Sequence, residues 1–461
     1  MERGTGGEVG RRDTRPAART ATLASTPGDD RPATCREPPI PKTARKPSGR
    51  RARTHANPTV PRDERAILVA VDWAHAEHWD VDASLAELAM LAETAGATPV
   101  ERVVQRLKHP DPHSYVGKGK LAAIAESRRD REASVVIFDD ELTPAQQRAL
   151  EAALDVKVID RTALILDIFA QRARTTEGAL QVALAQHEYL LPRLAGQWSH
   201  LERMEGAIGL RGPGETQLET DRRLIRAQIK TLKQRIERVR RHRREQRRRR
   251  AGMPVVALVG YTNAGKSTLL NGLTRAGVRT HDRLFETLDP TTRRWSIGAG
   301  GDPSGDGLGP AGAVLLTDTV GFIQKLPTQL IAAFRATLEE LQEADVLLHV
   351  IDITHPDAAE QAQTVEETLA DLGLLGRADA APRITVLNKI DRLLPAAGGA
   401  GMDEAAALAA LEPELRRALG ADRGEEVVLV SAARRWGFAA LRGAVGRGLG
   451  AGVEVAGGPS P

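Results

Sequence analysis

Short apolar runs alternate with helix-like segments in the part of the chain that follows residue 63. The runs predict strands, because strands of a buried parallel sheet are nearly continuous in Val, Ile and Leu. They cover residues 66–71, 100–107, 135–138 and 156–160, and the segments that predict helices cover 85–93, 120–128 and 143–154. Thr143 opens the third of these helices as its N-cap. The alternation predicts a small parallel α/β domain over residues 64–170.

A helical period replaces this alternation after residue 170. Residues 176–194 carry apolar positions at helical spacing, and a longer helix is predicted over 215–250. In the longer helix an apolar residue recurs at every seventh position, which is typical of a coiled-coil seam. The seam consists of Leu218, Ile225, Leu232 and Val239, with Ile229 and Ile236 between them. The two helices predict a helical hairpin, a coiled-coil subdomain, over residues 171–251.

Strand-like runs return in the second half, and each of them ends in polar or Gly-rich residues. They cover 255–259, 313–316, 384–387 and 426–430, with helix-like segments at 268–273 and 438–449. Because open α/β sheets bind ligands at the carboxyl ends of their strands, this arrangement predicts a nucleotide-binding α/β domain over 252–450. Residues 1–63, rich in Arg, Pro and Gly, predict a disordered basic tail, and 451–461 a second tail.

The first strand of the second half runs into a Gly-rich turn and then into a helix, which is the context of a phosphate-binding P-loop. The turn consists of Gly260, Tyr261, Thr262, Asn263, Ala264, Gly265, Lys266 and Ser267. Glycine lets the backbone turn its N–H groups inward, and the helix N-terminus adds partial positive charge. Lys266 is then placed to reach the terminal phosphates as a catalytic residue, and Ser267 to bind Mg²⁺.

The later strands end in the other parts of a GTP site. Asp318, Thr319, Val320 and Gly321 follow the second strand, Asn388, Lys389, Ile390 and Asp391 the third, and Ser431, Ala432 and Ala433 the fourth. Asp318 can hold Mg²⁺ through water, and Gly321 can offer its N–H to the γ-phosphate during catalysis. Asp391 can accept hydrogen bonds from guanine N1–H and the 2-amino group, which adenine cannot donate. These elements, in this order, predict a P-loop GTPase domain.

Two catalytic roles stay open at this point. Thr287, Thr291 and Thr292 compete for the position that closes over Mg²⁺ and the γ-phosphate, and spacing does not choose between them. Phe322 stands where many GTPases carry a Gln that positions water. Either Asn263 binds a K⁺ ion that bridges the phosphates, or a partner orders the catalytic group; as a third reading, Asn263 only stabilises the turn.

Composition narrows the class of protein. Hydrophobic residues make up 41% of the 461-residue chain, and the formal net charge is +4. The single cysteine, Cys35, excludes an intramolecular disulfide and a Cys-based zinc site. No apolar run approaches the length of a membrane span, and the N-terminus lacks a signal-peptide core, so we expect an intracellular protein.

Basic residues gather at the end of the long predicted helix. Such a cluster favours a phosphate-rich partner, because each arginine can displace a counterion from RNA. The candidate RNA contacts are Arg211, in the Gly-rich loop between the two helices, and Arg240, Arg241, Arg243, Arg244, Arg247 and Arg248. The basic turn at 115–120 could also contact phosphate, although a plain loop that enters a helix is the simpler interpretation.

Taken together, these motifs resemble the HflX family of translational GTPases, in the TrmE-Era-like class, over residues 66–450. Besides the P-loop, the resemblance rests on Leu288–Arg293, Asp318–Ile323, Asn388–Asp391, Tyr115–Lys120, Leu190–Leu194 and Arg211–Glu215. It implies that Thr287 is the catalytic, Mg²⁺-binding Thr, and that the GTP-binding segment comprises Phe285, Glu286, Thr287, Leu288 and Asp289. The Gly-rich loop departs from the family, because Glu205 and Ala207 interrupt its glycine run.

The resemblance also implies a function. Proteins of this family bind the large ribosomal subunit in their GTP form and split stalled or idle ribosomes under stress, with the hairpin against rRNA. It implies a cytoplasmic monomer that uses GTP, Mg²⁺ and, in one version, K⁺, with a peripheral membrane-associated fraction as an alternative location. A ribosome-assembly GTPase that acts on large-subunit precursors, and an RNA-remodelling NTPase, are the alternative functions.

Overall fold

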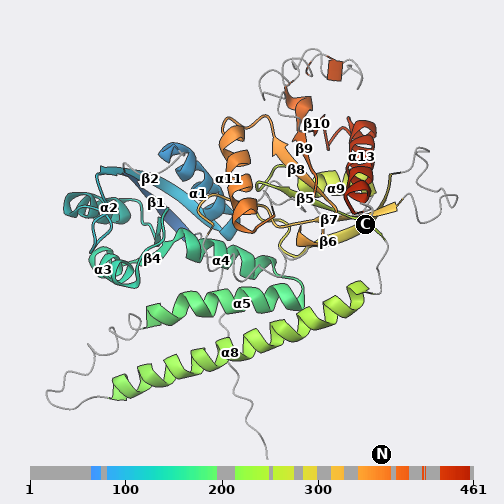
Figure 1. Ribbon diagram of the computed structural model, residues 1–461. Coiled ribbons are helices and arrows are strands. Elements are labelled where there is room, and N and C mark those ends of the chain that lie inside the picture. Colours follow the sequence, from blue (N-terminus) through green and yellow to red (C-terminus); the bar gives the residue numbers. More distant parts are fainter. Residues whose placement is uncertain are drawn as a thin grey trace, which may run out of the picture. The chain divides into compact units, whose positions relative to one another are not determined.

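The computed structural model divides the chain into two compact units, Met1–Thr59 and Val60–Pro461. Every residue described below belongs to the second unit (Figure 1). The described residues are 64–73, 80–194, 213–248, 253–274, 284–297, 313–326, 341–374, 381–393, 408–409, 411 and 426–456. The predicted tail at 1–63 therefore lies outside them.

The first sheet is parallel throughout and has the strand order β2-β1-β3-β4. Its strands are β1 (Glu64–Trp73), β2 (Ala97–Leu107), β3 (Val135–Phe138) and β4 (Lys157–Asp160), and the helices that connect them are α1 (Val81–Ala95), α2 (Lys118–Asp130) and α3 (Pro144–Leu154). Residues on both faces of β1 are buried, Leu68 in one apolar cluster and Val69 in another. Burial on both faces explains why β1 reads as a continuous apolar run.

Thr143 caps α3 as predicted. Its hydroxyl accepts a hydrogen bond from the backbone N–H of Gln146, and the Gln146 side chain accepts one from the backbone N–H of Thr143. This reciprocal pair is a capping box, which satisfies two N–H groups at the helix start.

Helix α4 (Arg161–Arg172) is a feature that the sequence analysis missed. The Asp160 side chain caps it by accepting from the backbone N–H of Ala163 at 2.8 Å. Ile165, Ile168 and Phe169 are fully buried along it. They occupy positions i, i+3 and i+4, which is the spacing of one face of a helix, so the helix could have been predicted.

The predicted hairpin consists of α5 (Thr176–Leu190), followed by the short helix η1 (Leu191–Arg193), and α8 (Pro213–Arg248). The two long helices lie side by side (Figure 1). Ile236 of the predicted seam is buried, and the seam residues Ile225, Ile229, Leu232 and Val239 are half-buried. Leu224, just outside the seam, is 54% exposed. The seam therefore packs on the neighbouring helix; the side chain of Leu218 lies outside the described residues.

Among the described residues, the second sheet has six strands in the order β10-β9-β8-β5-β7-β6. They are β5 (Val255–Gly260), β6 (Thr291–Ser296), β7 (Ala313–Asp318), β8 (Val346–Asp352), β9 (Arg383–Asn388) and β10 (Glu426–Leu429), and only the β6–β7 pair is antiparallel. The helices of this part are α9 (Lys266–Thr274), α11 (Ala358–Asp371), the short η3 (Ile390–Arg392) and α13 (Phe438–Ala456). Together the two sheets and the hairpin make the predicted α/β fold, with a P-loop GTPase domain.

Two expectations for this part need correction. The central strand β8 and helix α11 were not predicted, although Val346–Ile351 is mostly apolar and would have supported a strand. The predicted tail at 451–461 is also wrong at its start, because α13 continues to Ala456.

One apolar cluster joins the two sheets of the second unit. It contains Phe169 of α4 and Phe285 of the segment before β6, whose rings meet edge to face with centroids 4.6 Å apart. Tyr261 of the P-loop and Phe322 belong to the same cluster. Within the described residues, no helix is both long and apolar enough to cross a membrane.

Candidate nucleotide-binding site

The P-loop lies between the carboxyl end of β5 and the start of α9, as its sequence predicts. Gly260 and Gly265 have φ angles of +151° and +95°, which side-chain-bearing residues rarely adopt. A Cβ on Gly265 would lie 2.2 Å from Nδ2 of Asn388. Glycine at this position therefore allows the loop to approach the end of β9.

Lys266 is buried at the centre of this loop. Its Nζ donates hydrogen bonds to the carbonyl oxygens of Gly260 at 3.0 Å and Tyr261 at 2.7 Å. Burial lowers the pKa of Lys266 to about 8, although the carboxylate of Asp318 opposes this shift. The ammonium group thus lies inside the loop, where a P-loop lysine would meet phosphate.

Ser267, Thr287 and Asp318 form one polar cluster. Oδ2 of Asp318 accepts hydrogen bonds from Oγ of Ser267 at 2.6 Å and from Oγ1 of Thr287 at 3.0 Å, and the two hydroxyls are 2.8 Å apart. Burial raises the pKa of Asp318, against the opposing effects of Lys266 and the two hydroxyl donors. Its Oδ1 is a buried oxygen without a hydrogen-bond partner among the described residues.

This cluster fits the predicted Mg²⁺ site. Mg²⁺ prefers oxygen ligands at about 2.1 Å in octahedral geometry, which puts adjacent ligands about 3 Å apart. The separation of the Ser267 and Thr287 hydroxyls is close to that value. The unpartnered Oδ1 of Asp318 supplies an acceptor for a metal-bound water.

The structure separates the three competing threonines. Thr291 and Thr292 both lie in the strand β6, and the hydroxyl of Thr292 is 3.0 Å from that of Thr317 in β7. Of the three, Thr287 is the one whose hydroxyl is hydrogen bonded with Ser267 and Asp318, whereas Thr291 is paired with Asp318 through the backbone of the β6–β7 ladder. Its position supports the role that the family resemblance implies.

Gly321 and Phe322 lie against the P-loop. Phe322 N–H donates to the carbonyl of Gly260 at 3.1 Å, and its own carbonyl accepts from Thr262 N–H at 2.8 Å. A Cβ on Gly321 would lie 3.1 Å from Nζ of Lys266, so this glycine allows the close approach. The ring of Phe322 is buried in the apolar cluster and therefore is not available to orient water.

Asn263 leaves its two interpretations open. It is exposed, and its φ of +60° is the left-handed conformation that Asn tolerates in turns. A turn residue would adopt this conformation, and so would a residue that presents its side-chain oxygen to a cation.

The residues that are predicted to recognise the base meet at the carboxyl ends of β9 and β10. Asn388 donates from Nδ2 to the carbonyl of Ala264 at 2.8 Å, and its Oδ1 accepts from Ala432 N–H at 3.0 Å. It therefore ties the P-loop to the segment after β10. Asp391 accepts from Oγ of Ser431 at 2.6 Å, which fixes the orientation of its carboxylate.

The backbone N–H of Ala432, one of the predicted GTP-binding residues, donates to Oδ1 of Asn388. Ala433, the next residue, is exposed on the same loop. Two other residues of the predicted site have side-chain roles in the fold: Ile390 is fully buried, and Thr319 donates to the carbonyl of Leu258 at 2.6 Å.

Asp352 is a residue of this region that the sequence analysis missed. Its Oδ2 accepts a hydrogen bond from Nζ of Lys389 at 2.6 Å, and its Oδ1 accepts from the hydroxyl of Thr354. Asp352 ends β8, the strand that was not predicted, so the carboxyl-end rule would have found it once that strand was assigned. This ion pair fixes the ammonium group of Lys389 at the carboxyl end of β8.

The segment before β6 is arranged differently from the expectation that all five of its residues bind nucleotide. Phe285 and Leu288 bury their side chains in the apolar cluster. The Asp289 carboxylate is bonded to residues at the start of α5. Glu286 and Thr287 are half-buried, and Thr287 alone of the five contacts Ser267. In this arrangement Phe285, Leu288 and Asp289 could reach a nucleotide only through their backbone.

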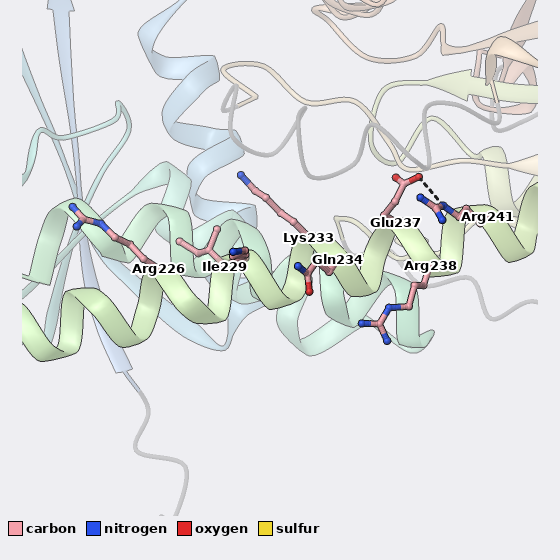
Figure 2. A pocket seen from close by; sticks show the side chains of 8 residues that line it. Arg226, Ile229, Lys233, Gln234, Glu237, Arg238 and Arg241 are labelled. Atoms are coloured by element: carbon pink, nitrogen blue, oxygen red, sulfur yellow. Dashed lines mark ion pairs between the residues drawn. The ribbon is translucent and has the colours of Figure 1, made fainter.

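A basic surface on α8 extends the predicted RNA-contact region. Of the predicted arginines, Arg240 and Arg241 have described side chains, and both lie within 4.0 Å of Glu237. The side chains of Arg243, Arg244, Arg247 and Arg248, and the whole of Arg211, lie outside the described residues. A groove on the same helix is lined by Arg226, Ile229, Lys230, Lys233, Gln234, Glu237, Arg238 and Arg241 (Figure 2). The basic residues before Arg240 were not predicted as RNA contacts, because they are interspersed with the apolar seam.

Three family models match successive parts of the chain. They are described as GTP-binding GTPase N-terminal, over residues 82–170, GTP-binding GTPase Middle Region, over 172–250, and 50S ribosome-binding GTPase, over 255–389. The last of these spans the P-loop, the Mg²⁺ cluster and Asn388.

Curated relatives match most of the chain. A protein named GTPase HflX from Caldanaerobacter subterraneus is 49% identical over 72% of this chain and 73% of its own length. GTPase HflX from Escherichia coli is 47% identical over 72% and 74%. Among solved structures, a GTP-binding protein from Sulfolobus solfataricus in complex with GDP is 24% identical, with a TM-score of 0.41 over 84% of this chain and 98% of that chain.

Proposed function

Because the chain belongs to the GTPase HflX family and hydrolyses GTP, we propose that it is a GTP-driven switch that binds the large ribosomal subunit and splits stalled or idle ribosomes. The family model described as 50S ribosome-binding GTPase supports the partner. The splitting of ribosomes is our addition to what that family description says.

A direct connection between the nucleotide site and the hairpin carries the proposal. Oδ2 of Asp289 accepts hydrogen bonds from the backbone N–H groups of Arg174 at 2.9 Å and Thr175 at 2.8 Å. The hydroxyl of Thr175 donates to the other carboxylate oxygen. Asp289 thus binds the N-terminus of α5, where partial positive charge favours an anion.

Asp289 lies two positions after Thr287 along the chain. If Thr287 binds Mg²⁺, movement of Thr287 on hydrolysis would shift Asp289 and so change the contact with α5. Such order–disorder changes of a switch segment are common in GTPases. The hairpin would then bind its partner differently in the GTP and GDP states.

The basic groove on α8 supports an RNA partner. Five of its eight lining residues are Arg or Lys, and Glu237 is the single acid among them (Figure 2). Lys233 pairs with Glu188 of α5 at 2.8 Å and Arg241 with Glu237 at 3.6 Å, so the positive potential rests mainly on Arg226, Lys230 and Arg238. Cationic surfaces of this kind bind nucleic acid mainly through phosphate.

The proposed mechanism assigns each polar residue one task. Lys266 and the P-loop N–H groups bind the phosphates, and Gly321 offers its N–H to the γ-phosphate. Ser267, Thr287 and Asp318 would hold Mg²⁺, which when bound neutralises the phosphate charge. Asp391 selects guanine. Since Phe322 is buried, water must be oriented by other groups, such as a K⁺ ion at Asn263 or a partner.

Sedimentation through sucrose separates this function from the alternatives. With a non-hydrolysable GTP analogue, the protein should pellet with free large subunits and reduce the peak of intact ribosomes, whereas GDP should do neither. Lys266→Ala is the matched control that cannot bind nucleotide productively. Binding to precursor particles alone would replace the proposal with a ribosome-assembly role. RNA unwinding by residues 64–170 without ribosomes would favour an RNA-remodelling NTPase.

A further inference from the structure

Lys325, four residues after Gly321, lies between two carboxylates of the first sheet. Its Nζ is 2.5 Å from Oδ2 of Asp139 and 2.6 Å from Oδ1 of Asp140. Both acids follow β3 at its carboxyl end. Lys325 has a φ of +52°, a conformation that costs energy for a residue with a side chain, so surrounding contacts must hold it there.

The charged groups around Lys325 explain why its side chain stays between Asp139 and Asp140. Arg161 is buried and pairs with two buried acids, Asp139 at 2.8 Å and Glu87. One guanidinium therefore serves two carboxylates, and Lys325 adds the second cation. Burial works against the charged form of Asp139, but the cations of Arg161 and Lys325 outweigh it and hold its pKa below the usual range. Removing Lys325 would leave a buried carboxylate in excess, which is unfavourable.

The Tyr115–Lys120 turn contributes to the same arrangement. The hydroxyl of Tyr115 donates to the Asp140 carboxylate, and the ring packs edge to face on Phe138 with centroids 5.9 Å apart. Tyr115 thereby orients the half-buried acid toward Lys325. The nucleotide site gives this turn no role, so its tyrosine is accounted for by the hydrogen bond to Asp140, which is a partner of Lys325.

A second connection lies beside the first. The phenol of Tyr261, in the P-loop, donates to the buried carboxylate of Glu87 and accepts from the backbone N–H of Gln324 at 2.9 Å. The hydroxyl of Ser84 donates to Asp139 at 2.6 Å and lies 3.4 Å from Oε1 of Gln324. The segment that follows Gly321 is thus bonded both to the P-loop and to α1.

We propose that Lys325 is a positioning residue for GTP hydrolysis. Held by Asp139 and Asp140, it fixes the segment 321–325 in one place, so that Gly321 N–H keeps its position over the P-loop. The proposal rests on the predicted contact of Gly321 with the γ-phosphate, and it makes the rate of hydrolysis depend on residues of the first sheet.

Steady-state GTP hydrolysis by the full chain, without ribosomes, tests this role. Lys325→Met removes the charge but keeps an unbranched side chain at a position that is 39% exposed. We expect kcat to fall by about tenfold or more, while KM and the Kd for GDP change by less than about threefold. Lys325→Arg can still bridge two carboxylates and should keep kcat within about threefold of the parent value.

Two further variants make the test specific. Asp140→Asn removes the half-buried partner, and combining it with Lys325→Met should lower kcat no further than Lys325→Met alone, because Lys325→Met already removes the contact with Asp140. Lys157→Met, at an exposed position in β4, is the control for the same substitution and should leave kcat unchanged. The proposal is overturned if Lys325→Met lowers the melting temperature but leaves kcat within about twofold, or if the losses multiply in the double variant.

Discussion

The hydroxyl of Ser431 donates a hydrogen bond of 2.6 Å to Oδ1 of Asp391, although the two residues follow different strands. The same hydroxyl accepts from the backbone N–H of Arg434 at 3.1 Å, which fixes the loop after β10. Ser431 therefore orients the carboxylate that is predicted to read guanine.

We expect Asp391→Asn to move nucleotide preference from GTP toward XTP, since an amide can donate to the xanthine 2-oxygen where a carboxylate only accepts. Competition binding with fluorescent GDP measures this preference. GTP affinity that is unchanged, with no gain for XTP, would remove Asp391 from the base site.

Ser431→Ala should weaken GDP binding by about fivefold, the size of one lost hydrogen bond that orients a charged group. The matched control is Ser134→Ala, an exposed serine after α2, which should leave the affinity unchanged. Equal affinities in the two variants would show that Ser431 does not orient Asp391.

Gly178→Ala tests the contact between Asp289 and α5. A Cβ at residue 178 would lie 2.3 Å from Oδ1 of Asp289, so the carboxylate must leave the helix N-terminus. We expect faster amide exchange at residues 174–179 and a smaller difference between the GTP-analogue and GDP forms in ribosome pelleting. Gly119→Ala is the control, because a Cβ there meets nothing within 4 Å. Identical behaviour of the two variants would break the proposed link between the nucleotide site and the hairpin.

The cation dependence of hydrolysis decides the role of Asn263. If Asn263 binds a bridging cation, K⁺ should raise kcat over Na⁺ by about tenfold, and Asn263→Ser should lose that difference while still binding GDP. Equal rates in the two buffers would leave Asn263 as a turn residue and point to a partner for the catalytic group.

The nucleotide site could be predicted from the sequence because its residues follow the strands in a fixed order. Ser267, Asp318 and Asn388 each follow an apolar run, and that local pattern is enough to place them at one edge of a sheet. The choice of Thr287 over Thr292 needed the structure, because the segment before β6 is irregular and gives no period from which to count.

Contacts between the two sheets were beyond the reach of sequence patterns. Lys325 and Asp139 are 186 positions apart, and Asp289 and Thr175 are 114 apart. Helical or strand periodicity does not predict contacts between positions so far apart. In the sequence alone, each of these residues resembles an ordinary surface charge or hydroxyl. They became visible only when the fold brought α1, β3 and α5 against the segments that surround the P-loop.

His349, in the central strand β8, gives a prediction for stability against pH. Both of its ring nitrogens are buried without a hydrogen-bond partner in the described residues, and burial, with repulsion from Arg383 and Lys266, lowers its pKa to about 3. In the unfolded chain the His349 imidazole takes up a proton near pH 6.5, whereas in the folded chain it stays neutral down to about pH 3. The unfolded state therefore binds more protons in this window, and the free energy of unfolding falls as pH is lowered from 6.5, by about 1.4 kcal/mol per pH unit. His349→Leu has nearly the same volume and removes the titration, so its stability advantage over the parent should grow as pH decreases from 7 to 5. Urea unfolding at several pH values measures this, and parallel curves for the two proteins would show that His349 has the same pKa in the folded chain as in the unfolded chain.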